Sequence, residues 1–124
     1  RTGYFVGPTV LVDTEQDDVL VREEICGPVI VALPFRDVDD LARQANDTAY
    51  GLAAGVWTKD ISKAHKLAKR IKAGTVWVNT FLVRDLTAPF GGMGISGIGR
   101  EGGDYALDFY SDLKTLQIVE GPTP

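Results

Sequence analysis

The chain has 124 residues, of which 13 are basic and 17 acidic, so its formal net charge is −4 with the one histidine neutral. This acidic balance argues against a general nucleic-acid binder and against a protein that binds acidic membranes. With 44% hydrophobic residues, 24% charged residues and no apolar run near the roughly 20 residues of a membrane span, the composition indicates one packed domain and not a membrane protein.

The first half of the chain begins with strand-like segments and continues with a helix. Residues 4–6 and 9–12 are rich in aromatic and β-branched side chains and predict a first strand or hairpin arm. The continuous apolar run at 29–33 is typical of a strand buried on both faces, so we expect it at the centre of a sheet. Asp37 is a good N-cap for a helix that ends between residues 46 and 51. Its apolar residues recur at helical spacing: Val38, Leu41, Ala42 and Ala45.

Two more strands and a second helix follow. Residues 52–57 predict a second buried strand, and the segment after Asp60 predicts a helix that Gly74 ends. The apolar stripe of this helix consists of Ala64, Leu67, Ala68 and Ile71. Residues 75–78 predict a third strand. Strands that alternate with helices across short connections form right-handed crossover units, so the fold class is α/β, with a mostly parallel sheet and crossover helices.

The last third of the chain is irregular and rich in glycine. Residues 80–103 show no regular period, and we expect a short helix at 104–110 and a last strand at 115–119. The pattern G-x-G-x-x-G occurs at 92–97 and again at 97–102. A dinucleotide-binding fingerprint needs a buried strand immediately before its first glycine, and none is expected here. A tight backbone path is therefore favoured over phosphate binding.

Cys26 and His65 are a candidate nucleophile and base, but the surroundings of His65 argue against that pair. His65 lies in a run of cations that is typical of a solvated helix face: Lys63, Lys66, Lys69, Arg70 and Lys72. Because no aromatic side chains are interleaved, the same run is not a nucleic-acid patch. A single cysteine also forms no internal disulfide, which favours the cytoplasm.

Two adjacent carboxylates, Glu23 and Glu24, precede a Gly27-Pro28 turn that leads into the apolar run at 29–33. The point where a loop enters a sheet edge is a good place for a ligand contact. From the residues alone, charges that cap a turn remain the favoured interpretation.

Five motifs in order span nearly the whole chain. They lie at residues 3–9, 23–29, 50–56, 74–79 and 89–101 and read GYFVGPT, EEICGPV, YGLAAGV, GTVWVN and PFGGMGISGIGRE. Together they resemble the C-terminal part of the catalytic domain of the aldehyde dehydrogenase superfamily. Residues 83–110 are most similar to dehydrogenases of muconate-type semialdehydes, which include 2-hydroxymuconate and 5-carboxymethyl-2-hydroxymuconate semialdehydes.

The resemblance implies a cofactor side and a substrate side for this chain. Glu24 matches a glutamate that accepts hydrogen bonds from the nicotinamide-ribose hydroxyls of NAD or NADP. Cys26 falls where the family has a phenylalanine near the nicotinamide ring, so it belongs to the cofactor site and is not the catalytic thiol. Phe90 matches an aromatic residue that lines the aldehyde tunnel, and residues 80–88 match the loop at the tunnel mouth.

Arg84 lies in that loop and is the one cation between Lys72 and Arg100. Its planar guanidinium matches a carboxylate in geometry and charge, so we expect it to bind a substrate carboxylate remote from the aldehyde. The similar enzymes often carry a second arginine three residues further on, where this chain has Thr87. A solvated loop arginine is the alternative interpretation.

The resemblance also implies an activity and an assembly. Residues 1–113 match the catalytic-domain portion and 114–124 an oligomerisation strand with a tail, which predicts a homo-oligomer, a dimer or tetramer. The family's nucleophilic cysteine, general-base glutamate and Rossmann domain precede the matched part, and the chain begins at Arg1 without a Met.

We therefore expect a fragment of an NAD(P)-dependent enzyme that oxidises an aldehyde to a carboxylic acid through a cysteine thiohemiacetal. Its small-molecule substrate would be a carboxylated semialdehyde. The fragment alone is expected to be inactive, with no catalytic residue and no metal ligand of its own. The rival hypothesis is a non-catalytic binding or assembly module on the same scaffold.

Overall fold

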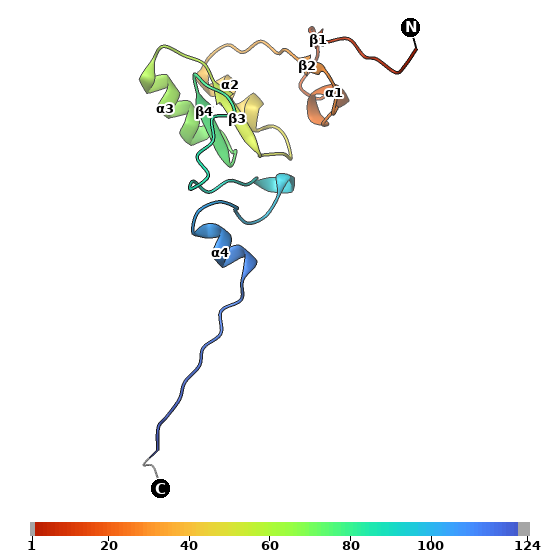
Figure 1. Cartoon of the computed structure of the whole chain (residues 1–124). Coiled ribbons are helices and arrows are strands. Elements are labelled where there is room, and N and C mark those ends of the chain that lie inside the picture. The colour runs from red at the N-terminus through yellow and green to blue at the C-terminus, as the bar shows by residue number, and fades with distance from the viewer. Residues whose placement is uncertain (1, 122–124) are drawn as a thin grey trace.

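The computed structural model describes residues 2–121 (Figure 1). Arg1 and residues 122–124, the outer ends of the expected portions 1–113 and 114–124, lie outside the described residues. The elements from β1 to β4 gather at one end of the molecule, and α4 with the extended residues that follow it leads away from them. In chain order the elements are β1 (Thr9–Leu11), α1 (Val19–Arg22), β2 (Val29–Val31), α2 (Val38–Asn46), β3 (Ala53–Val56), α3 (Ile61–Arg70), β4 (Thr75–Val78), the 3₁₀ turn η1 (Gly94–Ser96) and α4 (Tyr105–Tyr110).

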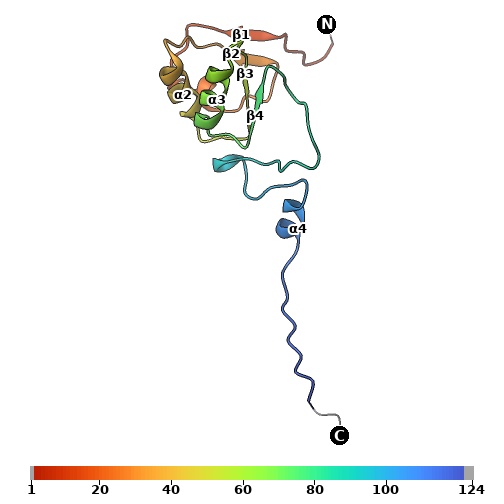
Figure 2. The same ribbon diagram turned by 90° about the vertical axis from the view of Figure 1, so that its left-hand side faces the viewer.

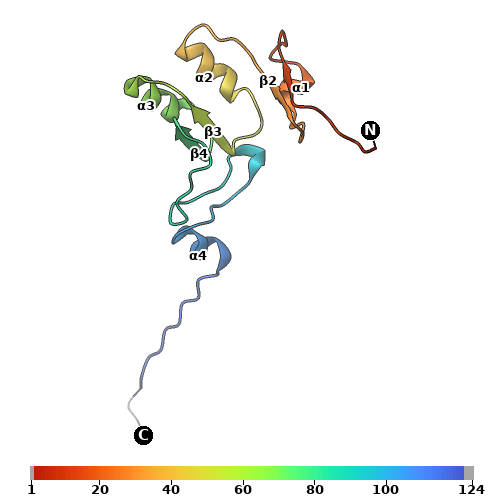
Figure 3. The same cartoon turned by 45° about the horizontal axis from the view of Figure 1, so that its top comes forward.

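The strands form two parallel pairs. β1 pairs with β2 from Thr9 opposite Val29, and β3 pairs with β4 from Ala53 opposite Thr75. One helix connects each pair, α1 or α3, as a parallel crossover requires. The α/β class with parallel strands and crossover helices is confirmed, with the strands in two two-stranded sheets. Figure 3 shows the β1–α1–β2 group beside the group of α2, β3, α3 and β4.

The core lies where α2 and α3 pack against β3 and β4 (Figure 2). Ala42, Val56 and Leu67 are buried together at its centre. The partly buried side chains around them come from the same elements and their ends: Val38, Leu41, Ile71, Val76 and Val78. The apolar stripes predicted for the two helices therefore face this core.

Side chains cap the starts of α2 and α3 and the end of α3. The Asp37 carboxylate accepts the N–H groups of Asp39 and Asp40 at the start of α2, at 2.9 and 2.8 Å, which confirms the predicted cap. Asp60 caps α3 in the same way. Asn46, the last residue of α2, donates to the Arg70 carbonyl at 2.8 Å and so satisfies the end of α3.

β2 differs from the strand that the sequence predicts. The expectation of a central strand at 29–33 was wrong, because β2 spans Val29–Val31 and pairs only with β1 among the described residues. Ile30 is 63% exposed. A continuous apolar run shows that both faces of a strand can be covered, but it does not show which segments cover them.

Residues 115–119 are not a strand within the described part of the chain. The segment after α4 has no strand or helix, and its apolar side chains are exposed, with Leu116 at 76% and Val119 at 94%. A strand needs a partner for its N–H and C=O groups, and no described segment lies beside this one. Residues 4–6 likewise stay outside β1, which begins at Thr9.

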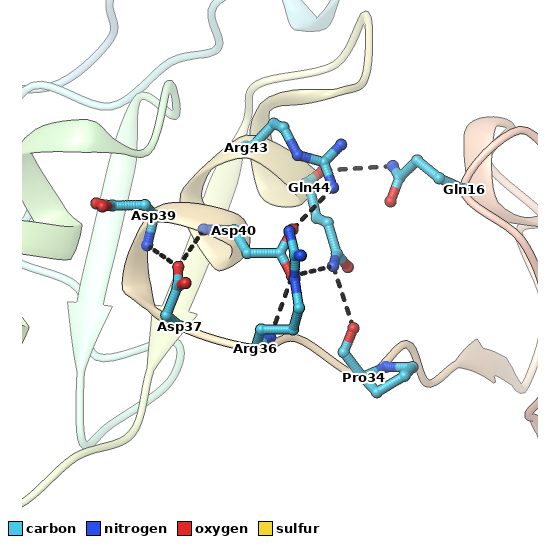
Figure 4. A network of polar contacts seen from close by, with 8 residues as sticks. All are labelled: Gln16, Pro34, Arg36, Asp37, Asp39, Asp40, Arg43 and Gln44. Carbon is cyan, nitrogen blue, oxygen red and sulfur yellow. Dashed lines mark hydrogen bonds and ion pairs between the residues drawn. The ribbon is translucent and has the colours of Figure 1, made fainter.

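A network of polar contacts connects α2 to the segment before α1 (Figure 4). The buried Asp40 carboxylate accepts from the Arg43 guanidinium at 2.8 Å and from the Arg36 backbone N–H at 3.1 Å. These two donors, Arg43 first, hold the pKa of the Asp40 carboxyl well below its usual value. Gln44 also donates to Asp40, and its carbonyl accepts from the Gln16 amide at 3.4 Å. The network thereby joins the two groups of elements.

The chain exposes more surface than its mass explains. Its accessible area is 10363 Å², whereas a folded monomer of 13.4 kDa exposes about 6,500 Å². Many large apolar side chains contribute to this area, among them Tyr4, Leu113 and Val119. Exposed apolar surface of this extent is unusual for a folded monomer. No helix within residues 2–121 is both long enough and apolar enough to cross a membrane.

A junction of three glycines attaches the glycine-rich loop to β3 and β4. The Gly51 carbonyl accepts the N–H groups of Gly74 and Met93, at 3.0 and 2.8 Å. A Cβ on Gly74 would lie 1.6 Å from the Gly91 carbonyl oxygen, so only glycine allows this approach. The prediction that Gly74 ends α3 was wrong, because α3 ends at Arg70 and its C-cap Ile71 is extended.

We expect Gly74→Ala to destabilise the fold by about 1–3 kcal/mol or more, because the added methyl group overlaps the loop backbone. Gly7→Ala is the matched control, since nothing lies within 4 Å of a Cβ at Gly7. The urea midpoint, followed by tryptophan fluorescence, measures both changes. Equal midpoints for the two variants would contradict the close approach at Gly74.

Candidate functional site

Glu24 lies at the edge of a cavity of about 340 Å³ between the turn before β2 and the start of β3. Glu24 is exposed and is the one carboxylate among the lining residues. The remaining wall consists mainly of small side chains and backbone: Gly51, Ala53, Ala54, Ala73 and Ser96. A carboxylate beside small residues can accept two hydrogen bonds from neighbouring hydroxyl groups of a ligand.

Cys26 lies close to Glu24 in sequence but does not line this cavity. It is exposed, and its backbone has a φ of 52° in the turn that leads into β2. The Val29 N–H closes the turn by donating to the Gly27 carbonyl at 2.8 Å. The structure thus places one of the two predicted cofactor residues, Glu24, at a cavity. No hydrogen bond joins Cys26 to the exposed His65 among residues 2–121.

A second cavity, of about 280 Å³, adjoins the first. It is lined by the glycine-rich loop together with Phe90, Arg100 and Glu101. Leu52 and Ser96 line both cavities, so the predicted cofactor residue Glu24 and the predicted substrate residue Phe90 lie on two sides of the same loop. The Ser96 hydroxyl accepts the Gly51 N–H at 2.9 Å and fixes this boundary.

The two predicted substrate residues contact each other. The Arg84 guanidinium carbon lies 4.2 Å from the centre of the Phe90 ring, which is the geometry of a cation–π contact. Arg84 also forms an ion pair with Glu101, with 2.5 Å between Nη2 and Oε1. Phe90 and Glu101 are joined by an antiparallel bridge, with N–H···O distances of 2.7 and 2.8 Å in the two directions.

A residue of β4, Trp77, holds the loop that carries Arg84. The Trp77 indole N–H donates to the Val83 carbonyl at 2.7 Å, one residue before Arg84. The Trp77 ring also packs edge-on against Phe81 at 5.2 Å. Further along, the Thr87 hydroxyl and N–H donate to Asp85 and lower the pKa of its carboxyl. Hydrogen bonds at Val83 and Asp85 therefore hold the exposed segment on both sides of Arg84.

Sequence reasoning missed Ser96, Trp77 and Glu101 as site residues. Trp77 and Ser96 were placed in family motifs, and Trp77 also in a strand, but neither was given a role in the site. Glu101 stands 17 positions from Arg84 in sequence, and the bridge that brings the two together closes a loop without a regular period. No local sequence signal indicates such a pair.

The glycine-rich loop and the cationic helix agree with their favoured interpretations. No strand of the described chain ends immediately before Gly92. Gly94 has a φ of 59° and passes directly beside the Ala49 carbonyl, which is the tight backbone path that was expected. The lysines of α3 are exposed, and Arg70 pairs with Asp39 of α2. Within residues 2–121, no group of three or more His, Cys, Asp or Glu side chains is placed to hold a metal ion.

A family model decides the classification of the chain. Residues 1–116 match the model described as "Aldehyde dehydrogenase family". The chain belongs to the aldehyde dehydrogenase family. Its similarity to curated relatives is high but covers only part of them, since the chain spans about a quarter of the length of the relatives that it matches.

Two relatives and one solved structure illustrate the similarity of this aldehyde dehydrogenase chain. It is 50% identical over 116 residues to a 2-aminomuconic 6-semialdehyde dehydrogenase of a Pseudomonas species, covering 94% of this chain and 24% of the relative. It is also 50% identical over 116 residues to aldehyde dehydrogenase [NAD(P)+] 1 of Saccharomyces cerevisiae, covering 94% of this chain and 23% of that protein. The NAD+ complex of an aldehyde dehydrogenase from Bacillus cereus superimposes with a TM-score of 0.87 at 52% identity, covering 92% of this chain and 23% of the other.

Proposed function

We propose that this chain is the C-terminal part of the catalytic domain of an NAD(P)-dependent aldehyde dehydrogenase that oxidises a carboxylated semialdehyde. The observation that carries the proposal is the Arg84 guanidinium stacked 4.2 Å above Phe90, in a chain that belongs to this family. Phe90 lines the second cavity, and Arg84 contacts it from outside the lining. An aromatic face beside an aldehyde tunnel holds an apolar stem, and a cation next to it binds a carboxylate at the far end of that stem.

The relatives support the substrate class. The similar Pseudomonas enzyme is named for a 2-aminomuconic 6-semialdehyde, and a human relative that is 42% identical is named for 2-aminomuconic semialdehyde. The yeast enzyme of equal identity is named only as an NAD(P)+-dependent aldehyde dehydrogenase. Sequence identity to these relatives therefore does not distinguish between substrates. The proposed substrate class rests on Arg84.

The Glu24 cavity fits one part of a dinucleotide cofactor. Its carboxylate and small wall residues suit a ribose with two neighbouring hydroxyl groups, whereas Lys72 is the one cation in the lining for a pyrophosphate. The remaining contacts would come from a preceding domain. NAD or NADP supplies the hydride acceptor when bound. In this chain, Glu24 would hold the ribose while Phe90 and Arg84 orient the aldehyde.

The catalytic steps would use groups outside this chain. A cysteine thiolate of the preceding part adds to the aldehyde carbon and forms a thiohemiacetal. A bound NAD or NADP would supply the hydride acceptor that turns the thiohemiacetal into a thioester, and water would then release the carboxylic acid and the thiol. The chain alone would then bind cofactor weakly and oxidise no aldehyde.

We further propose that the full-length enzyme is a homo-oligomer in the cytoplasm. The large exposed surface and the unpaired, apolar segment at 111–121 support an interface with a second subunit. The single exposed Cys26 suits a reducing compartment.

In the full-length enzyme, we expect Glu24→Gln to weaken cofactor handling while the fold stays intact. Hydrogen bonds to a charged acceptor contribute about 1.5–3 kcal/mol, so kcat/KM for the cofactor should fall roughly 10- to 150-fold. Glu23→Gln is the matched control, because Glu23 does not line the cavity. Initial rates at varied NAD measure both variants. An unchanged cofactor dependence in Glu24→Gln would remove this residue from the site.

Arg84→Ala tests the substrate class directly. Two six-carbon aldehydes serve as substrates for the full-length enzyme: 6-oxohexanoate, which ends in a carboxylate, and hexanal, which does not. We expect kcat/KM to fall at least about tenfold for 6-oxohexanoate and hardly at all for hexanal, because only the first loses a charge-assisted pair. Equal losses would mean that Arg84 only shapes the loop. A full-length protein that oxidises neither aldehyde would favour the non-catalytic module.

A further inference from the structure

Arg84, the residue proposed to bind the substrate carboxylate, already has a carboxylate partner in this structure. Glu101 occupies Nη2 of its guanidinium at 2.5 Å, and Phe90 covers one face of the same group. A second carboxylate that approaches Arg84 must take the place of Glu101 or bind beside its negative charge. Two carboxylates held by the same guanidinium repel each other, so binding beside the charge of Glu101 is unfavourable.

The pair is built so that the side chains can separate while the backbone stays in place. The Arg84 and Glu101 side chains are 43% and 53% exposed, so water reaches both, and an exposed ion pair of this kind contributes little stability. The Glu101 backbone is fixed separately by its two hydrogen bonds to Phe90. A rotation of the Glu101 side chain would therefore free Arg84 without opening the bridge.

We propose that Glu101 is a specificity-determining residue, the resident counter-ion of Arg84, whose place a substrate carboxylate takes on binding. This inference rests on the proposed function, because it assigns the exchange to the same substrate site. A neutral aldehyde leaves the Arg84–Glu101 pair intact and gains nothing from Arg84. A carboxylated aldehyde replaces one ion pair with another, so its net gain is smaller than for an unpaired arginine. Glu101 therefore lowers the affinity that Arg84 would otherwise give to a carboxylated aldehyde, and it leaves the affinity for a neutral aldehyde unchanged.

Equilibrium binding to the full-length enzyme separates this role from any effect of Glu101 on turnover. The probes are adipate, a six-carbon dicarboxylate, and hexanamide, a neutral compound of equal length, with Kd measured by calorimetry. In Glu101→Gln we expect adipate to bind about threefold more tightly or better, which is the scale of an exposed ion pair, with hexanamide unchanged. Glu101→Asp keeps the charge and should leave adipate binding close to that of the parent.

A double-mutant cycle identifies the cause of the change. In an Arg84→Gln background, Glu101→Gln should no longer alter the Kd of adipate. Asp104→Asn is the charge control, because Asp104 lies three residues from Glu101 and makes no side-chain cap hydrogen bond. It should leave adipate binding nearly unchanged.

Each outcome decides one of the two claims. Unchanged or weaker adipate binding in Glu101→Gln overturns the exchange, and so does equal tightening in Asp104→Asn or in the Arg84→Gln background. If Arg84→Gln alone leaves the Kd of adipate unchanged, the proposed carboxylate site itself fails, and no exchange at Arg84 takes place. Circular dichroism spectra that match the parent show that each variant is folded.

Discussion

The backbone contact at Gly51 holds both candidate cavities in place. Its carbonyl oxygen accepts N–H groups from the start of β4 and from the glycine-rich loop, Gly74 at 3.0 Å and Met93 at 2.8 Å. The loop reaches this position only because Gly74 has no Cβ, and its backbone passes directly beside Gly91. This junction, and not a side-chain core, positions the residues that we propose to contact cofactor and substrate.

The Arg84–Glu101 ion pair depends on how the junction at Gly51 places the glycine-rich loop. Once the loop is fixed at Met93, its two ends meet in the bridge between Phe90 and Glu101, and Glu101 then lies within reach of Arg84. Trp77 of β4 holds the segment that carries Arg84 through the Val83 carbonyl. The same few elements thus carry the aromatic face of Phe90 and the Arg84–Glu101 ion pair, the two features on which the proposed substrate class rests.

The sequence predicted the parts of the fold that depend on local signals. Helix α2 was recognised by an Asp cap and an apolar stripe within a few residues of each other, and α3 by its apolar stripe. The exposure of β2, the unpaired segment at 115–119 and the role of Gly74 depend on which segments lie beside them, and periodicity does not contain that information. Family resemblance singled out Glu24, Arg84 and Phe90 as candidates, whereas the contact of Arg84 with Phe90 and its pairing with Glu101 required the tertiary structure.

Native-state amide hydrogen exchange of the full-length enzyme tests the junction most directly. Amides that share one acceptor and one folded unit open together with a similar free energy. We expect the Gly74, Met93 and Phe90 amides to be protected as strongly as the amides of β3 and to exchange as one cooperative unit. Met93 and Phe90 amides that exchange at the rate of an unstructured chain, while β3 and β4 stay protected, would contradict it.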